Sequence, residues 1–422
     1  MSTRRIHYAW VVFGATFLTL FGASAFRSGI GVMLDPLHEQ FGWSKGQIGV
    51  AMSINLVLYG LVGPFAAAFM ARYGIRRIVL GALIAVGIGA YGASRVQTLW
   101  QLYLTWGVLV GAAAGFLAST LSSIVASRWF VARRGLVTGI MTAGMGSGQL
   151  VALPVLSRLA ETHGWRAVGI GVAVAVTAVI PIVVLALRDS PEQMGLRPYG
   201  AGEDFEPFRP TANPIRAAFG ALRDAASSGA FWVLVGSFGV CGLSTNGLVQ
   251  THFISAAADH GVAETAAAGY LALVGVFDVI GTIGSGILTD RFDPRTLLAT
   301  FYGLRGLSLL FLHQALDAHH LGLAGFIVFY GLDWIATVPP TIALANQLFG
   351  RNQGPLVYGW MFTAHQFGAA IAAWGGGYVA DRTGSYQLAF IIVGLLCLVA
   401  AGGVFMIDRW PAAGNEPRPA PA

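Results

Sequence analysis

Long apolar runs separated by short polar segments dominate this chain. The first run covers residues 8–34, and a run of that length is typical of a membrane-spanning helix, which needs about 20 apolar residues. The pattern recurs along the whole sequence and predicts an all-α integral membrane protein with twelve spans. These spans cover residues 8–32, 47–71, 77–95, 101–126, 136–160, 166–187, 230–256, 265–289, 296–314, 321–347, 356–380 and 387–408.

The composition agrees with this pattern. Of the 422 residues, 55% are hydrophobic and only 10% are charged, whereas a soluble domain carries roughly 25% charged residues. The two cysteines, Cys241 and Cys397, lie in apolar stretches and indicate neither a disulfide framework nor a metal site. A short basic start runs directly into a first span that is too long for a signal peptide, so no cleaved leader is expected.

The distribution of cations predicts the orientation. With the N-terminus inside, eighteen of the 25 Lys and Arg residues lie in inner segments and five in outer segments, while Arg27 and Arg305 lie within spans. Inner loops of membrane proteins carry an excess of these residues, so we expect both termini on the cytoplasmic side of the cell inner membrane. The net charge of +6 reflects this topology and is no indication of nucleic-acid binding.

The hydrophilic stretch 189–228 divides the spans into two groups of six and has the Pro, Gly and charge content of a linker. The two groups are weakly similar at an offset of 219 residues, which aligns Phe130 with Phe349 and Gly135 with Gly354. Parallel six-helix repeats are the plan of alternating-access transporters, whose site lies near the membrane midplane. The expected parts are an N-terminal bundle (1–188), the linker (189–228), a C-terminal bundle (229–410) and a cytoplasmic tail (411–422).

Two loop motifs resemble a known family. GILTDRFDPR (286–295) resembles the signature of the major facilitator superfamily, G-x-L-x-D-R followed by a basic residue, and AFMARYGIRR (68–77) is its counterpart in the first half. The resemblance implies the major facilitator fold, with two pseudo-symmetric bundles and loops that latch helix ends across an inner gate. Ala71 stands where the family has Asp, which suggests a weaker latch in the first half. The expected gating residues are Asp290, Arg291, Arg295, Arg72 and Arg76.

Longer segments resemble the monocarboxylate transporters and the related oxalate–formate antiporters. They include YAWVVFGATF, AFRSGIGVML and LVLYGLVGPFAAAFMARYGIRR near the start, and WFVARRGLVTGIMTAGMGSG after the fourth span. Members of these families move small carboxylates, often with a proton. The resemblance implies transport of a small organic anion, with protons and the lipid bilayer as further partners, no cofactor and a functional monomer.

Arg27 is the central candidate, because it lies inside the first apolar run. An unpaired cation near the bilayer centre costs between ~2.5 and ~17 kcal/mol, so it must face protein, water or an anion. Monocarboxylate transporters carry a Lys at the resembling position on helix 1, which implies substrate contact, and a guanidinium matches a carboxylate bidentately. The alternative is an Arg27 that snorkels outward or forms a structural pair.

Asp278 on the eighth span matches an Asp that monocarboxylate transporters use in proton coupling. A carboxyl in a low dielectric favours its neutral form and can exchange a proton near neutral pH. We expect Arg27 to pair with Asp278 and a substrate carboxylate to compete for Arg27; the alternative is a structural Asp bonded to neighbouring helices. Both reference families carry an Arg one turn later, where this chain has Thr282, so their two-cation arrangement is incomplete here.

Other polar residues within spans also have both a functional and a structural interpretation. The offset of 219 relates Arg27 to Asn246 and Tyr59 to Asp278. His365 stands where the oxalate group has a Lys, and is either a titratable substrate contact or a hydrogen-bonded packing residue. Arg305 and Asp333 are expected to form a buried ion pair, unless Arg305 replaces the missing cation of the eighth span. The expected substrate-binding residues are Arg27, Tyr59, Asn246, Gln250, Asn55, His365 and Gln366.

Other classes of function fit less well. A drug or metabolite exporter of the same superfamily would bind a hydrophobic or cationic substrate, which Arg27 disfavours, and an anion exchanger without proton coupling stays open. No Walker A sequence occurs, which argues against ATP-driven transport. An intramembrane enzyme would need a metal cluster or a nucleophile–base pair within a span, and a sensor would need a long soluble domain; the sequence indicates none of these, so no metal site is expected.

Overall fold

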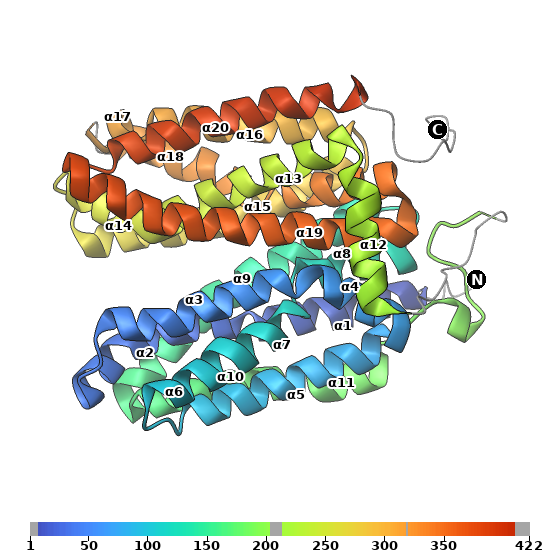
Figure 1. The fold of residues 1–422 in the computed structure, drawn as a ribbon, viewed down its shortest axis with the longest axis horizontal. Helices are drawn as coiled ribbons and strands as arrows, with labels where there is room; N and C mark the ends of the chain where they lie inside the picture. The colour runs from blue at the N-terminus through green and yellow to red at the C-terminus, as the bar shows by residue number, and fades with distance from the viewer. Residues whose placement is uncertain (1–6, 203–212, 318–319, 410–422) are drawn as a thin grey trace, which may run out of the picture.

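The computed structural model describes residues 7–202, 213–317 and 320–409. Within these ranges the protein is almost wholly helical, and its one β-type pairing is an isolated bridge between Phe130 and Tyr199. Figure 1 shows two helical bundles side by side, one formed by α1–α11 and one by α13–α20. Helix α1 begins and α20 ends at the same end of the molecule, which we call the terminal end; the opposite end is the far end.

Several passes of the N-terminal bundle consist of more than one helical segment. Its segments are α1 (Tyr8–Ala23), α2 (Ala25–Phe41), α3 (Lys45–Leu61), α4 (Gly63–Tyr73), α5 (Ile75–Ala93), α6 (Leu99–Leu102), the π-helical η1 (Tyr103–Val110), α7 (Gly111–Gly115), α8 (Ser119–Trp129), α9 (Arg134–His163), α10 (Trp165–Ala178) and α11 (Ile180–Ala186). A 3₁₀ turn, η2 (Glu192–Met194), follows.

The C-terminal bundle has the same character. Its segments are α13 (Gly229–Gly242), the π-helical η3 (Leu243–Val249), α14 (Gln250–Ala258), α15 (Glu264–Thr289), α16 (Pro294–Leu310), α17 (Leu312–Asp317), α18 (His320–Asp333), α19 (Val338–Thr383), α20 (Gln387–Phe405) and η4 (Met406–Arg409). Helix α12 (Pro214–Ala226) lies between the two bundles in the sequence.

Nine helical segments in the described part of the chain are long and apolar enough to cross a membrane, or ten if the bent pair α3–α4 counts as one span. The remaining difference from the twelve predicted spans has two causes. Helix α19 runs through a break at Gly350, whose φ of 75° is left-handed, so it contains the end of one pass and the whole of the next. Helix α16 has only 17 residues, and α17 continues it after Phe311.

Local sequence signals set several helix ends. Ser44 Oγ accepts a hydrogen bond from the backbone N–H of Gln47, and the Gln47 side chain accepts one from the N–H of Ser44, which makes a capping box at the start of α3. Gly42 closes α2 in the left-handed conformation that a glycine adopts without strain. Both helix ends that flank the short loop between α2 and α3 are therefore capped.

The breaks within helices repeat between the bundles. Helix α1 ends before Ser24, and 219 residues later Leu243 begins the π-helical segment η3. The irregular turn at 116–118, between α7 and α8, corresponds by the same offset to the one at 335–337, between α18 and α19. Discontinuous helices at corresponding positions in the two halves are where transporters of this plan build their sites.

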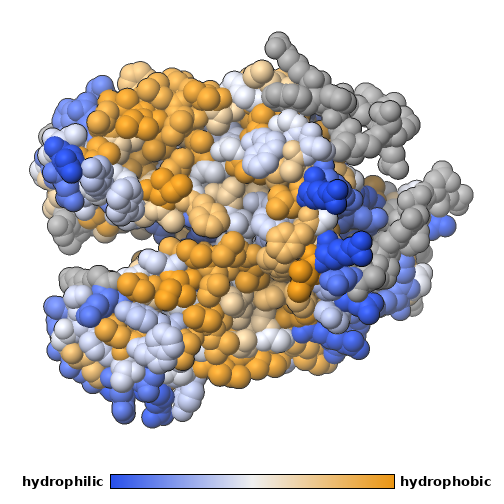
Figure 2. Space-filling model, in the orientation of Figure 1, coloured by the Kyte–Doolittle hydropathy of each residue, from blue (hydrophilic) through white to orange (hydrophobic). Residues whose placement is uncertain are grey.

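The bundles touch mainly at the terminal end. Helix α9 packs against α15, and α19 packs against α3, α4 and α8. Glycines allow the closest approach, since a Cβ added to Gly139 would lie 2.7 Å from the carbonyl oxygen of Thr282. Figure 2 shows the bundles meeting at the terminal end and a hollow between them at the far end. The structure is therefore closed at one end and open at the other.

The segment expected to be a plain linker contains a helix. Helix α12 packs on α4 and α19 and so touches both bundles (Figure 1). Trp360 Nε1 donates a hydrogen bond to the carbonyl of Ala218 at 2.9 Å. The rings of Phe65, Phe219 and Trp360 lie 5.6–6.0 Å apart. The expected tail, 411–422, lies outside the described residues.

Candidate functional site

Arg27 lies in the first turn of α2, directly after the break at Ser24, and is partly buried. Its guanidinium carbon is 5.6 Å from the centre of the Tyr59 ring on α3. Such a cation–π contact is worth roughly 0.5–2 kcal/mol. Among the described side chains, no carboxylate forms an ion pair with Arg27. Within the described part of the chain, the cation therefore contacts an aromatic ring and no anion that would neutralise it.

Aromatic rings connect Arg27 to the other bundle. Tyr59 contacts Phe362 of α19 with ring centres 5.4 Å apart, and Phe362 stacks on His365 at 6.1 Å. His365 is 8% exposed, and its Nδ1 atom has no hydrogen-bond partner in the ranges that the structure describes. The charge of Arg27 acts electrostatically on both Tyr59 and His365. The structure thus brings together three of the predicted site residues, from helices of both bundles.

Gln366 adds a second unsatisfied polar atom beside His365. It is 5% exposed, its aliphatic part packs against Gly60 of α3, and its Oε1 has no hydrogen-bond partner among the residues described. Leaving a buried polar group unpaired costs about 1–3 kcal/mol. Two such atoms on consecutive residues of α19 need an explanation, and a polar ligand would supply one.

The other polar candidates differ in their surroundings. Asn246 lies in the π-helical segment η3 and is partly buried, while Gln250 at the start of α14 is exposed. Neither side chain forms a hydrogen bond within the described part of the chain. Asn55, which we expected in the substrate site, instead donates from Nδ2 to the carbonyl of Trp106 at 2.7 Å. That bond joins α3 to η1 inside the N-terminal bundle, so Asn55 has a packing role.

Asp278 does not pair with Arg27, contrary to expectation. It is 2% exposed, and its Oδ1 accepts hydrogen bonds from Thr282 Oγ1 at 2.8 Å and from the backbone N–H of Ile335 at 2.9 Å. Thr282, which stands where the resembling families have an Arg, is thus a direct partner of the carboxylate. On the other side, a Cβ added to Gly146 of α9 would lie 3.0 Å from Oδ2. Asp278 therefore lies at the contact between the two bundles.

Side chains of neighbouring helices form hydrogen bonds with the backbone N–H and C=O groups of the broken turn between α18 and α19. Asp278 accepts from the free N–H of Ile335, and Ser285 donates to the carbonyl of Ala336. Arg305 donates to the last carbonyls before the break. Backbone groups inside a membrane must all find partners, so these three side chains are what allows the helix to be discontinuous.

Arg305 and Asp333 form an ion pair inside the C-terminal bundle, with Nε and Oδ2 2.6 Å apart. Arg305 is fully buried. Its Nη1 donates to Cys241 Sγ at 3.0 Å and to Ser244 Oγ at 3.4 Å, and its Nη2 donates to the carbonyls of Asp333 and Trp334. Every guanidinium nitrogen is occupied, so Arg305 does not serve as a second cation beside Arg27.

The predicted gate is built asymmetrically. At the end of α15, Asp290 accepts hydrogen bonds from the backbone N–H groups of Gly135 at 2.6 Å and Leu136 at 2.8 Å. These groups open α9, where the helix dipole favours an anion. The offset of 219 relates Asp290 to Ala71 and Leu136 to Pro355. The latch that would correspond to it therefore lacks both its carboxylate, at Ala71 of the first half, and one of its two N–H groups, at Pro355 of the second half.

Two arginines of the motifs have local partners in their own halves. Arg295 pairs with Asp293 at 2.5 Å, and Asp293 also caps α16. The backbone N–H of Arg76 donates to Asp189 at 2.7 Å, which caps α5 in the same manner. Arg72 and Arg291 are exposed.

Three contacts that sequence reasoning missed also join the bundles. Ser127 Oγ donates to Asn346 Oδ1 at 3.1 Å, Arg351 Nη2 donates to the carbonyl of Ser127 at 2.5 Å, and Tyr358 donates to Ser119 Oγ at 2.8 Å. The offset of 219 also relates Ser127 to Asn346, so the repeat held a signal for that contact. Nothing in the sequence indicated the other two.

Comparison with known proteins shows which family shares this architecture. The Major Facilitator Superfamily profile matches residues 16–342 and, in a second match, 253–422. YcxA, an MFS-type transporter of Bacillus subtilis (strain 168), is 24% identical over 95% of each chain. Monocarboxylate transporter 11 of Mus musculus is 26% identical over 91% of this chain and 84% of its own. The crystal structure of the transporter FucP in the outward conformation aligns over 95% of this chain and 99% of its own, with a TM-score of 0.69 and 18% identity.

Proposed function

This chain belongs to the Major Facilitator Superfamily of membrane transporters, and we propose that it moves a small organic anion of the monocarboxylate type by alternating access. The observation that carries the proposal is Arg27, a partly buried cation without a carboxylate partner among the described residues. The monocarboxylate transporters among its relatives support the anion class.

The surroundings of Arg27 support a small carboxylate rather than a large substrate. A guanidinium binds a carboxylate through two parallel hydrogen bonds. His365 Nδ1 and Gln366 Oε1 have no hydrogen-bond partner among the described residues. The amide oxygen can accept from a hydroxyl of the ligand, and a protonated Nδ1 can donate to one of its oxygens. The rings of Tyr59 and Phe362 would contact a short apolar carbon chain. This combination disfavours a cationic drug.

We infer the direction of access from the contacts between the bundles. The terminal end is closed by Asp290, Ser127 and Tyr358, whereas the far end is hollowed (Figure 2). From the excess of cations in the inner segments, we infer that both termini lie on the cytoplasmic side of a cell inner membrane. In that orientation the protein is in an outward-facing state, and it works as a monomer.

Proton coupling is the second part of the proposal, with Asp278 as the titrating group. Protonation would neutralise a carboxylate at the contact of α15 with α9, where its Oδ2 faces Gly146. The same proton would weaken the acceptor that holds the N–H of Ile335 in the break before α19. One protonation would thus change both the contact between the bundles and a discontinuous helix, without a direct bond to Arg27.

Uptake into proteoliposomes tests the anion assignment. Labelled lactate, pyruvate and oxalate would be offered with and without an inward proton gradient. We expect uptake of at least one of them, a loss of roughly tenfold or more in Arg27→Ala, and partial activity in Arg27→Lys. Arg158→Ala, an exposed arginine of the same bundle, is the matched control and should transport normally. Normal uptake by Arg27→Ala would refute the role of this cation.

A further inference from the structure

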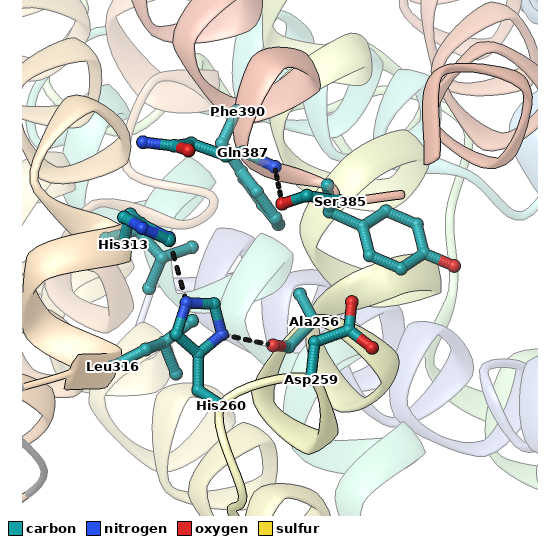
Figure 3. Close-up of a pocket in the computed structure, with 10 residues that line it drawn as sticks. Ala256, Asp259, His260, His313, Leu316, Ser385, Gln387 and Phe390 are labelled. Carbon is teal, nitrogen blue, oxygen red and sulfur yellow. Dashed lines mark hydrogen bonds between the residues drawn. The ribbon is translucent and has the colours of Figure 1, made fainter. Parts of the chain in front are cut away.

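Three side chains of metal-ligating types, those of His260, His313 and Asp317, meet at the far end of the C-terminal bundle, away from the substrate site. Figure 3 shows the two histidines facing each other. His260 follows α14, while His313 and Asp317 lie one turn apart on α17. His260 Nε2 is 2.8 Å from His313 Nδ1 and 3.6 Å from Asp317 Oδ1, and His313 Nε2 is 3.7 Å from Asp317 Oδ2. One ligand atom from each residue lies within 4.8 Å of the other two.

A backbone hydrogen bond orients the first histidine for this role. His260 Nδ1 lies 2.8 Å from the carbonyl oxygen of Ala256. A carbonyl only accepts hydrogen bonds, so Nδ1 is the donor. In the neutral ring the lone pair is then on Nε2, where it accepts the hydrogen bond that His313 Nδ1 donates at 2.8 Å, and a bound ion would take the place of that proton. Histidines that bind metals characteristically donate their other ring N–H to a carbonyl or carboxylate in this way.

Two of the three side chains, those of His260 and His313, border a cavity of a suitable size. It has a volume of about 10 Å³, and its lining includes His260, His313, Asp259 and Tyr386. That is about the room needed for one water molecule, and hence for a single ion. The side chains of His260 and His313 are 13% and 33% exposed, while Asp317 is 60% exposed. An ion can therefore enter from the surface and be held by partly buried nitrogens.

We propose that His260, His313 and Asp317 bind a first-row divalent transition ion such as Zn²⁺ or Ni²⁺. Two imidazoles and one carboxylate are a common ligand set for these ions, whereas Ca²⁺ and Mg²⁺ prefer oxygen ligands. Nitrogens bound to one tetrahedral zinc lie about 3.3 Å apart, given Zn–N distances of about 2.0–2.1 Å. The ring of His313 would therefore move by about half an ångström on binding.

The bound ion would join α14 to α17, two separate passes of the same bundle. It would not bridge the two bundles, so it stabilises the C-terminal bundle and leaves alternation free. The inference does not depend on the identity of the transported substrate. It differs from the expectation that the chain has no metal site, because its ligands come from two different passes.

Isothermal titration calorimetry of tag-free, full-length protein with ZnCl₂ and NiCl₂, after treatment with a chelator, tests the site. We expect one ion per chain, and at least tenfold weaker binding in His260→Ala, His313→Ala and Asp317→Asn. His163→Ala changes an exposed histidine at the end of α9 and should bind as the unaltered protein does.

Thermal unfolding without metal separates a loss of the site from a loss of the fold. Each variant should unfold at nearly the same temperature as the unaltered protein when no ion is present, and only the unaltered protein and His163→Ala should gain stability from Zn²⁺. Unchanged binding in both His260→Ala and His313→Ala would overturn the proposal. So would an absence of binding at millimolar ion, or binding lost only in the double variant His319→Ala/His320→Ala.

Discussion

Ser127 and Asn346 form a hydrogen bond across the contact between the bundles, and they are 219 residues apart, the offset of the internal repeat. Two residues related by a pseudo-twofold axis touch each other only where that axis passes between them. The bond between them, 3.1 Å long, therefore marks the axis at the closed end of the protein. Arg351 reinforces it by donating to the carbonyl of Ser127.

Removing this bond should favour opening of the terminal end. The double variant Ser127→Ala/Asn346→Ala loses a buried hydrogen bond that contributes about 0.5–1.5 kcal/mol, or roughly a two- to thirteenfold change in the ratio of open to closed states. Spin labels on Tyr73→Cys and Phe292→Cys, exposed at the ends of α4 and α15, would report the distance. The population with a longer distance should grow, and Ser53→Ala, on an exposed surface, should leave it unchanged.

The asymmetry of the gate leads to a prediction about Ala71. Introducing the carboxylate of the family motif, Ala71→Asp, should not create a second latch, because Pro355 has no N–H to donate. The double variant Ala71→Asp/Pro355→Leu restores both partners and should stabilise the closed terminal end. A double-mutant cycle on the melting temperature would measure a favourable coupling of roughly 0.5–3 kcal/mol. Zero coupling would contradict the proposed correspondence between the two halves.

Asp278→Asn should separate proton coupling from substrate exchange. The amide keeps an oxygen for the N–H of Ile335 and the hydroxyl of Thr282, but it cannot titrate. We expect counterflow of labelled substrate to persist while stimulation by an inward proton gradient disappears. Glu161→Gln, at an exposed position of α9, should keep normal stimulation. If Asp278→Asn is stimulated normally, the protein either titrates elsewhere, with His365 or Asp333 next to test, or exchanges anions without protons.

Arg305→Met should destabilise the C-terminal bundle strongly. It leaves Asp333 buried without its cation and removes the donors from the carbonyls at the end of α18. Breaking a buried ion pair in this way costs about 3–5 kcal/mol. Thermal unfolding in detergent should show a lower melting temperature than for Arg305→Met/Asp333→Leu, in which both charges are gone. Equal melting temperatures of the two variants would mean that the charges of the ion pair contribute little to stability beyond the volume that the two side chains fill.

The fold could be predicted from the sequence because the length of an apolar run and its flanking cations are set by the bilayer itself. The predicted all-α membrane fold and the family resemblance are confirmed by the superfamily match. The offset of 219 also carried real information, since the breaks after Ala23 and after Gly242 correspond in the structure.

The details of the site could not be predicted in the same way. Depth along a helix can be read from sequence, but the direction in which a side chain points cannot, which is why the pairing of Arg27 with Asp278 was wrong. The true backbone partner of Asp278, the N–H of Ile335, exists only because a helix is broken there. The ligands His260 and His313 are 53 residues apart and belong to different passes, so only the folded chain brings them together.

The broken turn between α18 and α19 has a mechanical consequence. Its backbone is held by Asp278 and Ser285 from α15 and by Arg305 from α16. Because these hydrogen bonds join the turn to α15 and α16, it cannot bend further without moving both helices. A force on the turn is therefore transmitted through the C-terminal bundle. That bundle should behave as a stiff lever during transport, and the more adaptable joint is then the matching break at 116–118 in the other half.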